Sequence, residues 1–168
     1  MSISLLIHLI IPDTTALSAL QVLQRHMPNS IHQLSRELAW EFDTAELPQP
    51  TAEALARRLT QTDVLVNFNK HRARWWIGPI NEAPFPRPAP SQCIAGLLVS
   101  NRDDSEAHRI LHILQHRLGF YEISAARHAT LWWITTAKQS NPIPIATYAR
   151  DMLLANPASQ EATVLLAP

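Results

Sequence analysis

Glycine, cysteine and excess charge are all scarce in this sequence. Its 168 residues include three glycines and one cysteine, Cys93, and its 14 Lys and Arg residues balance 14 Asp and Glu residues. So few glycines argue against a glycine-rich loop that cradles a nucleotide phosphate. A single cysteine forms no intrachain disulfide and no thiolate metal cluster, which fits a reducing cytoplasm. The balanced charge argues against a nucleic-acid partner.

Long apolar runs are also missing. The apolar segment from Ile3 to Ile11 contains His8 and is followed at once by Pro12 and Asp13. Because a helix needs about 20 apolar residues to cross a bilayer, this segment is too short for a membrane span. No basic region precedes it, as one would in a secretory leader. We therefore expect a buried strand here, and a cytoplasmic protein that does not bind a membrane.

A proline-rich stretch lies near the middle of the sequence. Prolines recur at every second residue from Pro84 to Pro90, and Pro79 precedes them. Such a stretch cannot continue a helix or a central strand, and it favours an extended, semi-rigid chain. We therefore expect a first repeat at residues 1–78, a linker at 79–91 and a second repeat at 92–168.

The same order of signals occurs on both sides of this stretch, which indicates a diverged duplication. In the first repeat the expected strand, helix, extended segment, helix and extended segment are 3–11, 14–26, 31–43, 51–61 and 64–69. Their counterparts in the second repeat are 93–100, 104–117, 121–136, 143–154 and 162–166. We interpret each repeat as β-α-β-β-α-β, the order of a ferredoxin-like sandwich.

Two pairs of adjacent tryptophans indicate that the sheets are covered on both faces. Trp132 and Trp133 must point to opposite faces of a strand, and the same holds for Trp75 and Trp76. One member of each pair can contact the helices, and the other needs a second cover. The simplest cover is the sheet of the other repeat, with a partner protein as the alternative. We therefore expect an α+β fold of two tandem ferredoxin-like units, packed as a pseudo-dimer through their sheets.

The sequence carries no motif of autonomous catalysis, so we assign no catalytic residue and no cofactor. The nearest approach to a metal site is a series at every fourth position of an expected helix, opposite its apolar stripe: His108, His112 and His116. Histidines one turn apart can bind a divalent metal, but no further ligand completes a structural zinc site here. A solvated polar face is the simpler interpretation. Asp104 is expected to cap the same helix.

The last third of the sequence contains two motifs, one at the end of an expected helix and one at the end of the next helix. Leu118-Gly119-Phe120-Tyr121-Glu122 runs from a helix end into a strand and is followed by Arg127, and Leu153-Leu154-Ala155-Asn156-Pro157 ends the next helix. Together they resemble the small, PurS-type subunit of phosphoribosylformylglycinamidine synthase over residues 93–168. Two positions depart from that family. Ala129 and Thr130 replace its Gly-Lys pair, and the helix entry starting at Asp104 lacks its proline and glycine.

This resemblance implies an assembly subunit of purine biosynthesis without activity of its own. In that family the small subunit joins an ATP-using synthetase to a glutaminase, so that ammonia from glutamine reaches formylglycinamide ribonucleotide. Those two subunits are the expected partners in an ATP- and glutamine-dependent ligase complex. The candidate interface residues are Glu122, Arg127, Trp132, Trp133, Asn156 and Pro157. If the first repeat is a degenerate copy, one chain would replace a homodimer. Self-association of the chain is left open.

Two other function classes stay open on the sequence alone. A tandem ACT-like regulatory module shares the element order and binds a small amino acid between two copies. Such sites commonly use a glycine-containing turn after the first strand, which Ile11-Pro12-Asp13-Thr14 and Ser100-Asn101-Arg102-Asp103 lack. The third class is a protein-interaction domain that binds no small ligand.

Overall fold

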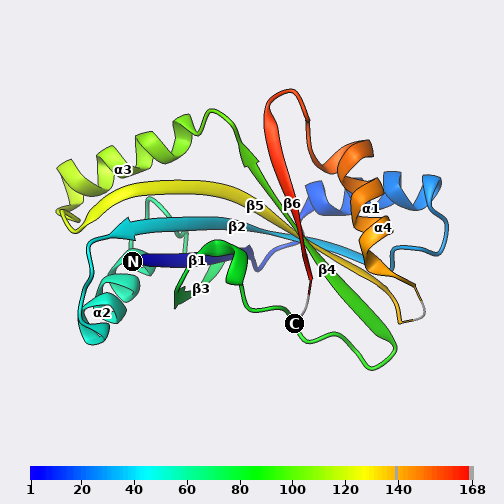
Figure 1. Ribbon diagram of the computed structural model, residues 1–168, viewed down its shortest axis with the longest axis horizontal. Helices are drawn as coiled ribbons and strands as arrows, with labels where there is room; N and C mark the ends of the chain where they lie inside the picture. Colours follow the sequence, from blue (N-terminus) through cyan, green and yellow to red (C-terminus); the bar gives the residue numbers. More distant parts are fainter. Residues whose placement is uncertain (139, 167–168) are drawn as a thin grey trace. The chain divides into compact units, whose positions relative to one another are not determined.

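A computed structural model describes residues 1–138 and 140–166 of the chain (Figure 1). The described residues form four α-helices and a single six-stranded antiparallel sheet in the order β3-β1-β2-β5-β4-β6. The elements are β1 (Ser2–Leu9), α1 (Thr14–His26), β2 (Gln33–Thr44), α2 (Gln49–Thr60), β3 (His71–Ile77), η1 (Ile80–Glu82), β4 (Gln92–Asn101), α3 (Ser105–Leu118), β5 (Ile123–Ala137), α4 (Pro142–Ala149), η2 (Arg150–Leu154) and β6 (Gln160–Leu166). The α+β class is confirmed.

The four expected helices form, and the cap of α3 is the expected one, whereas the caps of α1 and α2 differ from the threonines expected there. Asp13 caps α1 by accepting hydrogen bonds from the N–H groups of Thr15 and Ala16, and Asp104 caps α3 by accepting from Ala107. Gly119 ends α3 in the left-handed conformation, which glycine adopts without steric cost. The fourth expected helix divides into α4 and a π-helical turn, η2.

Each expected β-β pair is instead one long strand. The segment expected at 31–43 is β2, with 12 residues, and the segment at 121–136 is β5, with 15 residues. Neither strand contains glycine, so neither has the Asn-Gly, Asp-Gly or Gly-Gly pair that a two-residue hairpin turn favours. The prediction of an extended segment at 64–69 is also wrong. Asn67 accepts a hydrogen bond from the N–H of Asn69 and forms a turn there, and β3 begins only at His71.

The chain divides into two compact units, and each unit is built from three separate segments of the sequence. The first unit consists of Met1–Ile11, Leu38–Ala83 and Asp103–Ala129, and the second of Pro12–Glu37, Pro84–Arg102 and Thr130–Pro168. Consequently β2 and β5 each contribute to both units. Neither expected repeat, 1–78 or 92–168, coincides with one of these compact units, because each unit contains segments of both repeats.

Each unit has its own apolar core between its helices and one face of its strands. In the first unit, β1 contributes alternate residues (Ile3, Leu5 and Ile7), and α2 and α3 contribute their apolar stripes, with Leu55 and Leu114 among them. In the second unit the core joins Leu23 of α1, Leu97 of β4, Trp132 of β5 and Ala146 of α4. Thus α1 packs in the second unit and α3 in the first.

The proline-rich segment contacts strand residues in both units. In the first unit, the Trp76 indole N–H donates to the carbonyl oxygen of Pro79 at 3.1 Å. In the second, the Phe85 ring lies edge-on to Trp133, with 5.0 Å between ring centroids. The expected stacking of one sheet on another is not observed, since all described strands belong to one sheet. Residues expected to act as a linker therefore provide part of the missing cover.

Candidate functional site

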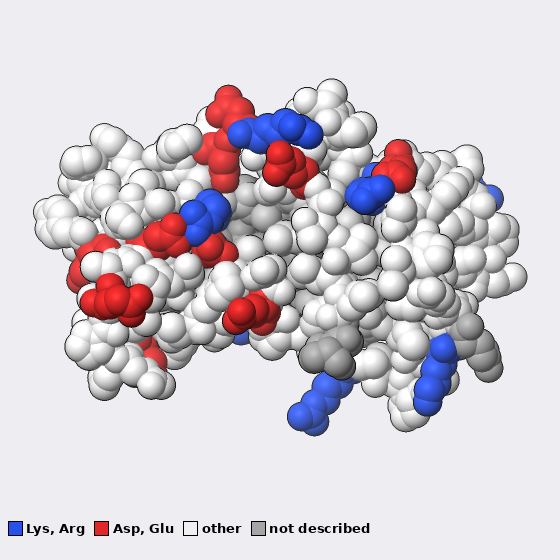
Figure 2. Space-filling view, in the orientation of Figure 1, with Lys and Arg blue, Asp and Glu red and all other residues white. Residues whose placement is uncertain are grey.

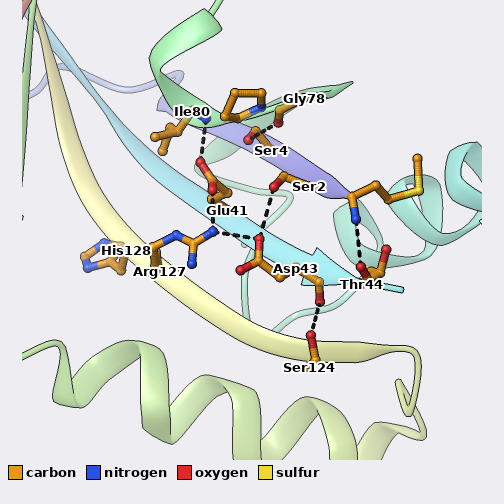
Figure 3. A network of polar contacts seen from close by, with 12 residues as sticks. Ser2, Ser4, Glu41, Asp43, Thr44, Gly78, Ile80, Ser124, Arg127 and His128 are labelled. Carbon is orange, nitrogen blue, oxygen red and sulfur yellow. Dashed lines mark hydrogen bonds and ion pairs between the residues drawn. The ribbon is translucent and has the colours of Figure 1, made fainter. Parts of the chain in front are cut away.

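Arg127 of β5 holds two carboxylates of β2 in the first unit (Figure 3). Its Nη2 donates to Glu41 Oε1 at 2.5 Å and to Asp43 Oδ1 at 2.6 Å. Glu41 and Asp43 lie two residues apart on one strand, so they leave the same face and one guanidinium reaches both. The hydrogen bond between Arg127 and Asp43 is the main cause both of a raised pKa of Arg127 and of a lowered pKa of Asp43. Arg127 and Asp43 therefore stay charged near neutral pH.

Glu41 is the buried member of this cluster. It is only 6% exposed, whereas the Arg127 side chain is 53% exposed. Its second carboxylate oxygen, Oε2, accepts a hydrogen bond from the backbone N–H of Ile80 at 2.6 Å. A buried carboxylate is tolerated when ion pairs and hydrogen bonds satisfy it. The cluster therefore fastens the start of the proline-rich segment to the sheet, and its exposed part is the guanidinium of Arg127.

The same end of the sheet is closed by further bonds to Asp43 (Figure 3). The Ser2 hydroxyl donates to Asp43 Oδ1 at 3.0 Å, and the Ser124 hydroxyl donates to the Asp43 carbonyl oxygen at 3.1 Å. These bonds tie β1 and β5 to β2. The cluster therefore holds three strands of the first unit together.

His128 follows Arg127 and packs against Trp40, with 4.5 Å between ring centroids. Its backbone N–H donates to Asp104 Oδ2 at 2.6 Å, so Asp104 both caps α3 and holds β5. Burial lowers the pKa of His128, and attraction to Asp104 and Glu106 opposes that shift. The neutral imidazole is therefore the form that the folded chain favours.

The second unit contains an apolar pocket of about 290 Å³. It is lined by Thr15, Ser18, Ala19, Val22, Trp132, Leu153 and Leu154. Trp132 is buried, whereas the side chain of Leu153 is 42% exposed at the surface. The volume lies at the lower end for a small-molecule site, and it suits one or two apolar side chains of a protein partner.

An ion pair supports the tryptophan of this pocket. Arg36 lies over the Trp132 ring, with its Cζ 5.8 Å from the ring centroid, and pairs with Asp13 at 2.7 Å. Asp13 is also the N-cap of α1, so the capping residue that starts the helix fixes the arginine above the ring. Hydrogen bonds to Arg36 and to the helix N–H groups lower the pKa of Asp13, against a burial effect that would raise it.

The Leu153-Leu154-Ala155-Asn156-Pro157 motif has a clear structural role. Leu154 lies in the core, and the N–H of Ala155 donates to the carbonyl of Arg150, which gives the π-helical turn. The Asn156 side chain accepts a hydrogen bond from Ala158, and its carbonyl accepts from Gln160. Asn156 thus forms the turn into β6, and Pro157 cannot continue the helix.

A second, charged pocket of about 420 Å³ lies beside this turn. It is lined by Arg102, Arg150, Asp151, Ala155, Pro157, Gln160, Glu161 and Ala162. Its charges occur in pairs: Arg150 with Asp151 at 2.6 Å and Arg102 with Glu161 at 3.6 Å. Such exposed pairs stabilise the fold little and can exchange partners for a ligand that carries both charges.

The remaining predicted residues lie apart from these features. Glu122 pairs with Arg58 at 3.1 Å, and both side chains are more than a third exposed. The series His108, His112 and His116 is exposed on α3, as expected, and the last two rings lie 4.5 Å apart. Within residues 1–138 and 140–166, no three His, Cys, Asp or Glu side chains are grouped so as to hold a metal.

The carboxylates of β2 were not predicted from the sequence. Glu37 and Glu41 are buried and Asp43 is partly buried, and Glu41 and Asp43 pair with Arg127. The available signal was acidic residues at alternate positions of a strand whose other positions, such as Trp40 and Phe42, are apolar. That alternation placed the carboxylates on one face, although it could not identify their partner.

No family model matches this sequence, and no curated protein matches it either. Among the described helices, none combines the length and the apolar character required to cross a bilayer. On the face shown in Figure 2, uncharged residues form most of the surface. A function must therefore be argued from the strand order, the pockets and the motifs described above.

Proposed function

We propose that the chain is the non-catalytic coupling subunit of a cytoplasmic phosphoribosylformylglycinamidine synthase, and that one chain takes the place of two copies. The observation that carries this proposal is the strand order. The order β3-β1-β2-β5-β4-β6 reads the same from either edge when β1, β2 and β3 are exchanged for β4, β5 and β6. A duplicated subunit that pairs with its own copy is expected to give such an order.

The helices follow the same rule. α1 comes after the first strand of its repeat and belongs to the second unit, and α3 comes after the first strand of its repeat and belongs to the first unit. Each compact unit thus takes one helix from the other repeat. This exchange is typical of intertwined pairs of identical chains, and it supports a fused pair over two independent ferredoxin-like domains.

The motifs behind the family resemblance meet at one surface feature. Leu153 and Leu154 belong to the second of these motifs, Trp132 is an interface candidate of the same resemblance, and all three line the apolar pocket of the second unit. An apolar pocket with an aromatic ring is the usual anchor point of a protein interface. We infer that the pocket receives an apolar side chain of the synthetase or the glutaminase.

The direct test is an assay of formylglycinamide ribonucleotide conversion by the synthetase and glutaminase subunits from the same source, with and without this chain. We expect glutamine-dependent turnover to require the chain and ammonia-dependent turnover not to require it. Size-exclusion chromatography should show the three chains eluting together. Full glutamine-dependent turnover without the chain, and no co-elution, would overturn the proposed function.

A matched pair of variants tests the pocket. Leu153→Asp puts a charge into the pocket lining, whereas Leu17→Asp puts one at an exposed leucine of α1 outside the lining. The two side chains are 42% and 52% exposed, so both variants should fold. We expect only Leu153→Asp to weaken co-elution with the partners. Equal effects of the two variants would argue against docking at this pocket.

A tandem ACT-like module is the second candidate, because one observation favours it. The charged pocket includes Arg102, in the turn after the first strand of the second repeat, together with carboxylates. An amino acid carries the complementary charges. A ligand that binds only the native state raises its melting temperature, so thermal shift with a panel of amino acids tests this function. The shift should disappear in Arg102→Met and persist in the exposed control Arg87→Met.

A further inference from the structure

The strand β6 forms one edge of the sheet (Figure 1). Among the described strands it pairs only with β4, in the antiparallel register that sets Leu98 opposite Thr163. The residues from Ala162 to Leu166 contain no charge, no proline and no glycine. Natural proteins usually protect an edge strand with such residues, because its free N–H and C=O groups pair readily with another strand. Over residues 162–166 this edge has no such protection.

The register identifies the backbone groups that face outward. The N–H of Arg102 donates to the carbonyl of Ser159, which marks these two residues as a hydrogen-bonded pair. In an antiparallel ladder, hydrogen-bonded and non-bonded pairs alternate. The non-bonded positions on β6 are therefore Gln160, Ala162, Val164 and Leu166. The N–H of Gln160 donates to Asn156, and the N–H and C=O groups of the other three point away from β4. Leu166 is also an exposed apolar side chain.

The opposite edge of the sheet is built differently. The strand β3 carries Arg72 and Arg74, and Lys70 precedes it. Two copies of this edge would bring like charges together, which is unfavourable. The hydrogen bond from the Ile10 N–H to the Lys70 carbonyl identifies these two residues as a hydrogen-bonded pair of the β1–β3 ladder. By the same alternation Ala73 is at a non-bonded position, so its N–H points away from β1. The sheet of the described residues thus has one protected edge and one neutral edge.

We propose that β6 pairs antiparallel with β6 of a second copy of this chain, which joins the two sheets into one. The pairing satisfies the outward N–H and C=O groups of both copies. Glu161 is the charged residue of β6, and Arg102 pairs with it. When residues 162–166 of one copy pair antiparallel with residues 162–166 of the other, the two copies of Glu161 lie at opposite ends of the contact. Each chain has one neutral edge, so assembly stops at two copies.

A matched pair of proline variants tests this contact. Val164→Pro removes an outward N–H from the neutral edge without removing a bond to β4, and Ala73→Pro does the same at the charged edge. Both side chains are partly buried against a core, so the two changes disturb packing comparably. Light scattering after size exclusion should give twice the mass of one chain for the unmodified protein and for Ala73→Pro. It should give the mass of one chain for Val164→Pro.

A second variant covers the case in which Val164→Pro does not fold. Thr163→Lys changes an exposed residue of β6 and brings two positive charges together across the contact. We expect this variant to be folded, by its circular dichroism spectrum, and monomeric. A monomeric unmodified protein at all soluble concentrations would overturn the proposal. So would a dimer that persists in folded Thr163→Lys or Val164→Pro.

Discussion

The indole N–H of Trp133 donates a hydrogen bond to Glu37 Oε2 at 2.6 Å, inside the second unit. Both residues are buried, and Trp133 is only 3% exposed. The ring is also held edge-on by Phe85 of the proline-rich segment. Trp133 had been expected as an interface candidate. In the structure it joins β5, β2 and the proline-rich segment of its own chain.

We predict that Trp133→Phe lowers the free energy of unfolding by about 1–3 kcal/mol. The phenyl ring keeps most of the apolar contact but cannot donate to Glu37, and losing one partner of a buried hydrogen bond costs about this much. Urea unfolding at neutral pH measures the loss. A double-mutant cycle with Glu37→Leu isolates the bond, and a coupling energy near zero would show that Trp133 acts through its shape alone.

Arg127→Met should destabilise the first unit by about 1–3 kcal/mol. The change removes the positive charge beside Glu41 and Asp43. Removing one partner of a fully buried ion pair costs about 3–5 kcal/mol, and the exposure of Arg127 reduces that cost. Adding Glu41→Gln should recover part of the stability, because no buried charge then lacks its partner. Unfolding curves of the single and double variants test the prediction, and no recovery would contradict it.

The same arginine sets part of the acid sensitivity. Arg127 lowers the folded-state pKa of Asp43 below its ordinary value of 3.8. A depressed carboxyl pKa contributes stability that is present above pH 3.8 and lost as the pH falls through the folded-state value. In Arg127→Met, the part of the acid destabilisation due to Asp43 should shrink. Melting temperatures from pH 5 downward, with Arg87→Met as an exposed control, provide the measurement.

His128 should make the fold less stable below neutral pH. Burial holds its pKa under the ordinary value of 6.5, although Asp104 and Glu106 oppose this effect. Protonation therefore favours the unfolded chain, so the contribution is intact above pH 6.5 and is lost as the pH falls through the folded-state value. His128→Asn should flatten the stability curve in this window. Burial also lowers the pKa of His71. Adding His71→Asn should therefore remove part of the pH dependence of stability that remains in His128→Asn.

Neither repeat should fold as a monomer when produced alone. Residues 1–91 lack α3, which the first core needs, and α4, which the second core needs. Residues 92–168 lack α2 of the first core and α1 of the second core. We expect each fragment to show no cooperative unfolding as a monomer. The two fragments mixed together should restore cooperative unfolding and the spectrum of the intact chain. A stable, monomeric fragment 1–91 would contradict the division into interleaved units.

The helices and the two ends of α3 could be predicted because their signals are local. Asp104 at a helix start and Gly119 at its end act within one turn of the chain. The strand pairing could not be predicted in this way, since the alternation of β2 or β5 says which residues share a face and not which strand lies beside it. Each of the segments 31–43 and 121–136 was interpreted as two strands because the ferredoxin-like fold requires a pair of strands there. The absence of turn residues was the better guide.

The candidate sites were predictable only in part. The sequence singled out Arg127 and Trp132, and the structure places Arg127 in an ion-pair cluster and Trp132 in an apolar pocket. Their partners come from distant segments, Glu41 from β2 and Val22 from α1. Such contacts are set by the topology of the whole chain, and no spacing within one motif specifies them.

The interleaving of the two units also constrains how the chain is made. The first core needs Leu114 and Ile123 to close around β1, and the second needs Leu154 to close around α1. During synthesis the N-terminal strand must therefore wait, with its apolar face uncovered, until most of the chain has left the ribosome. Contacts this distant in sequence make folding slow and expose the early segments to aggregation. Newly made chains should therefore depend on chaperones more than chains of the same length whose domains fold one after the other.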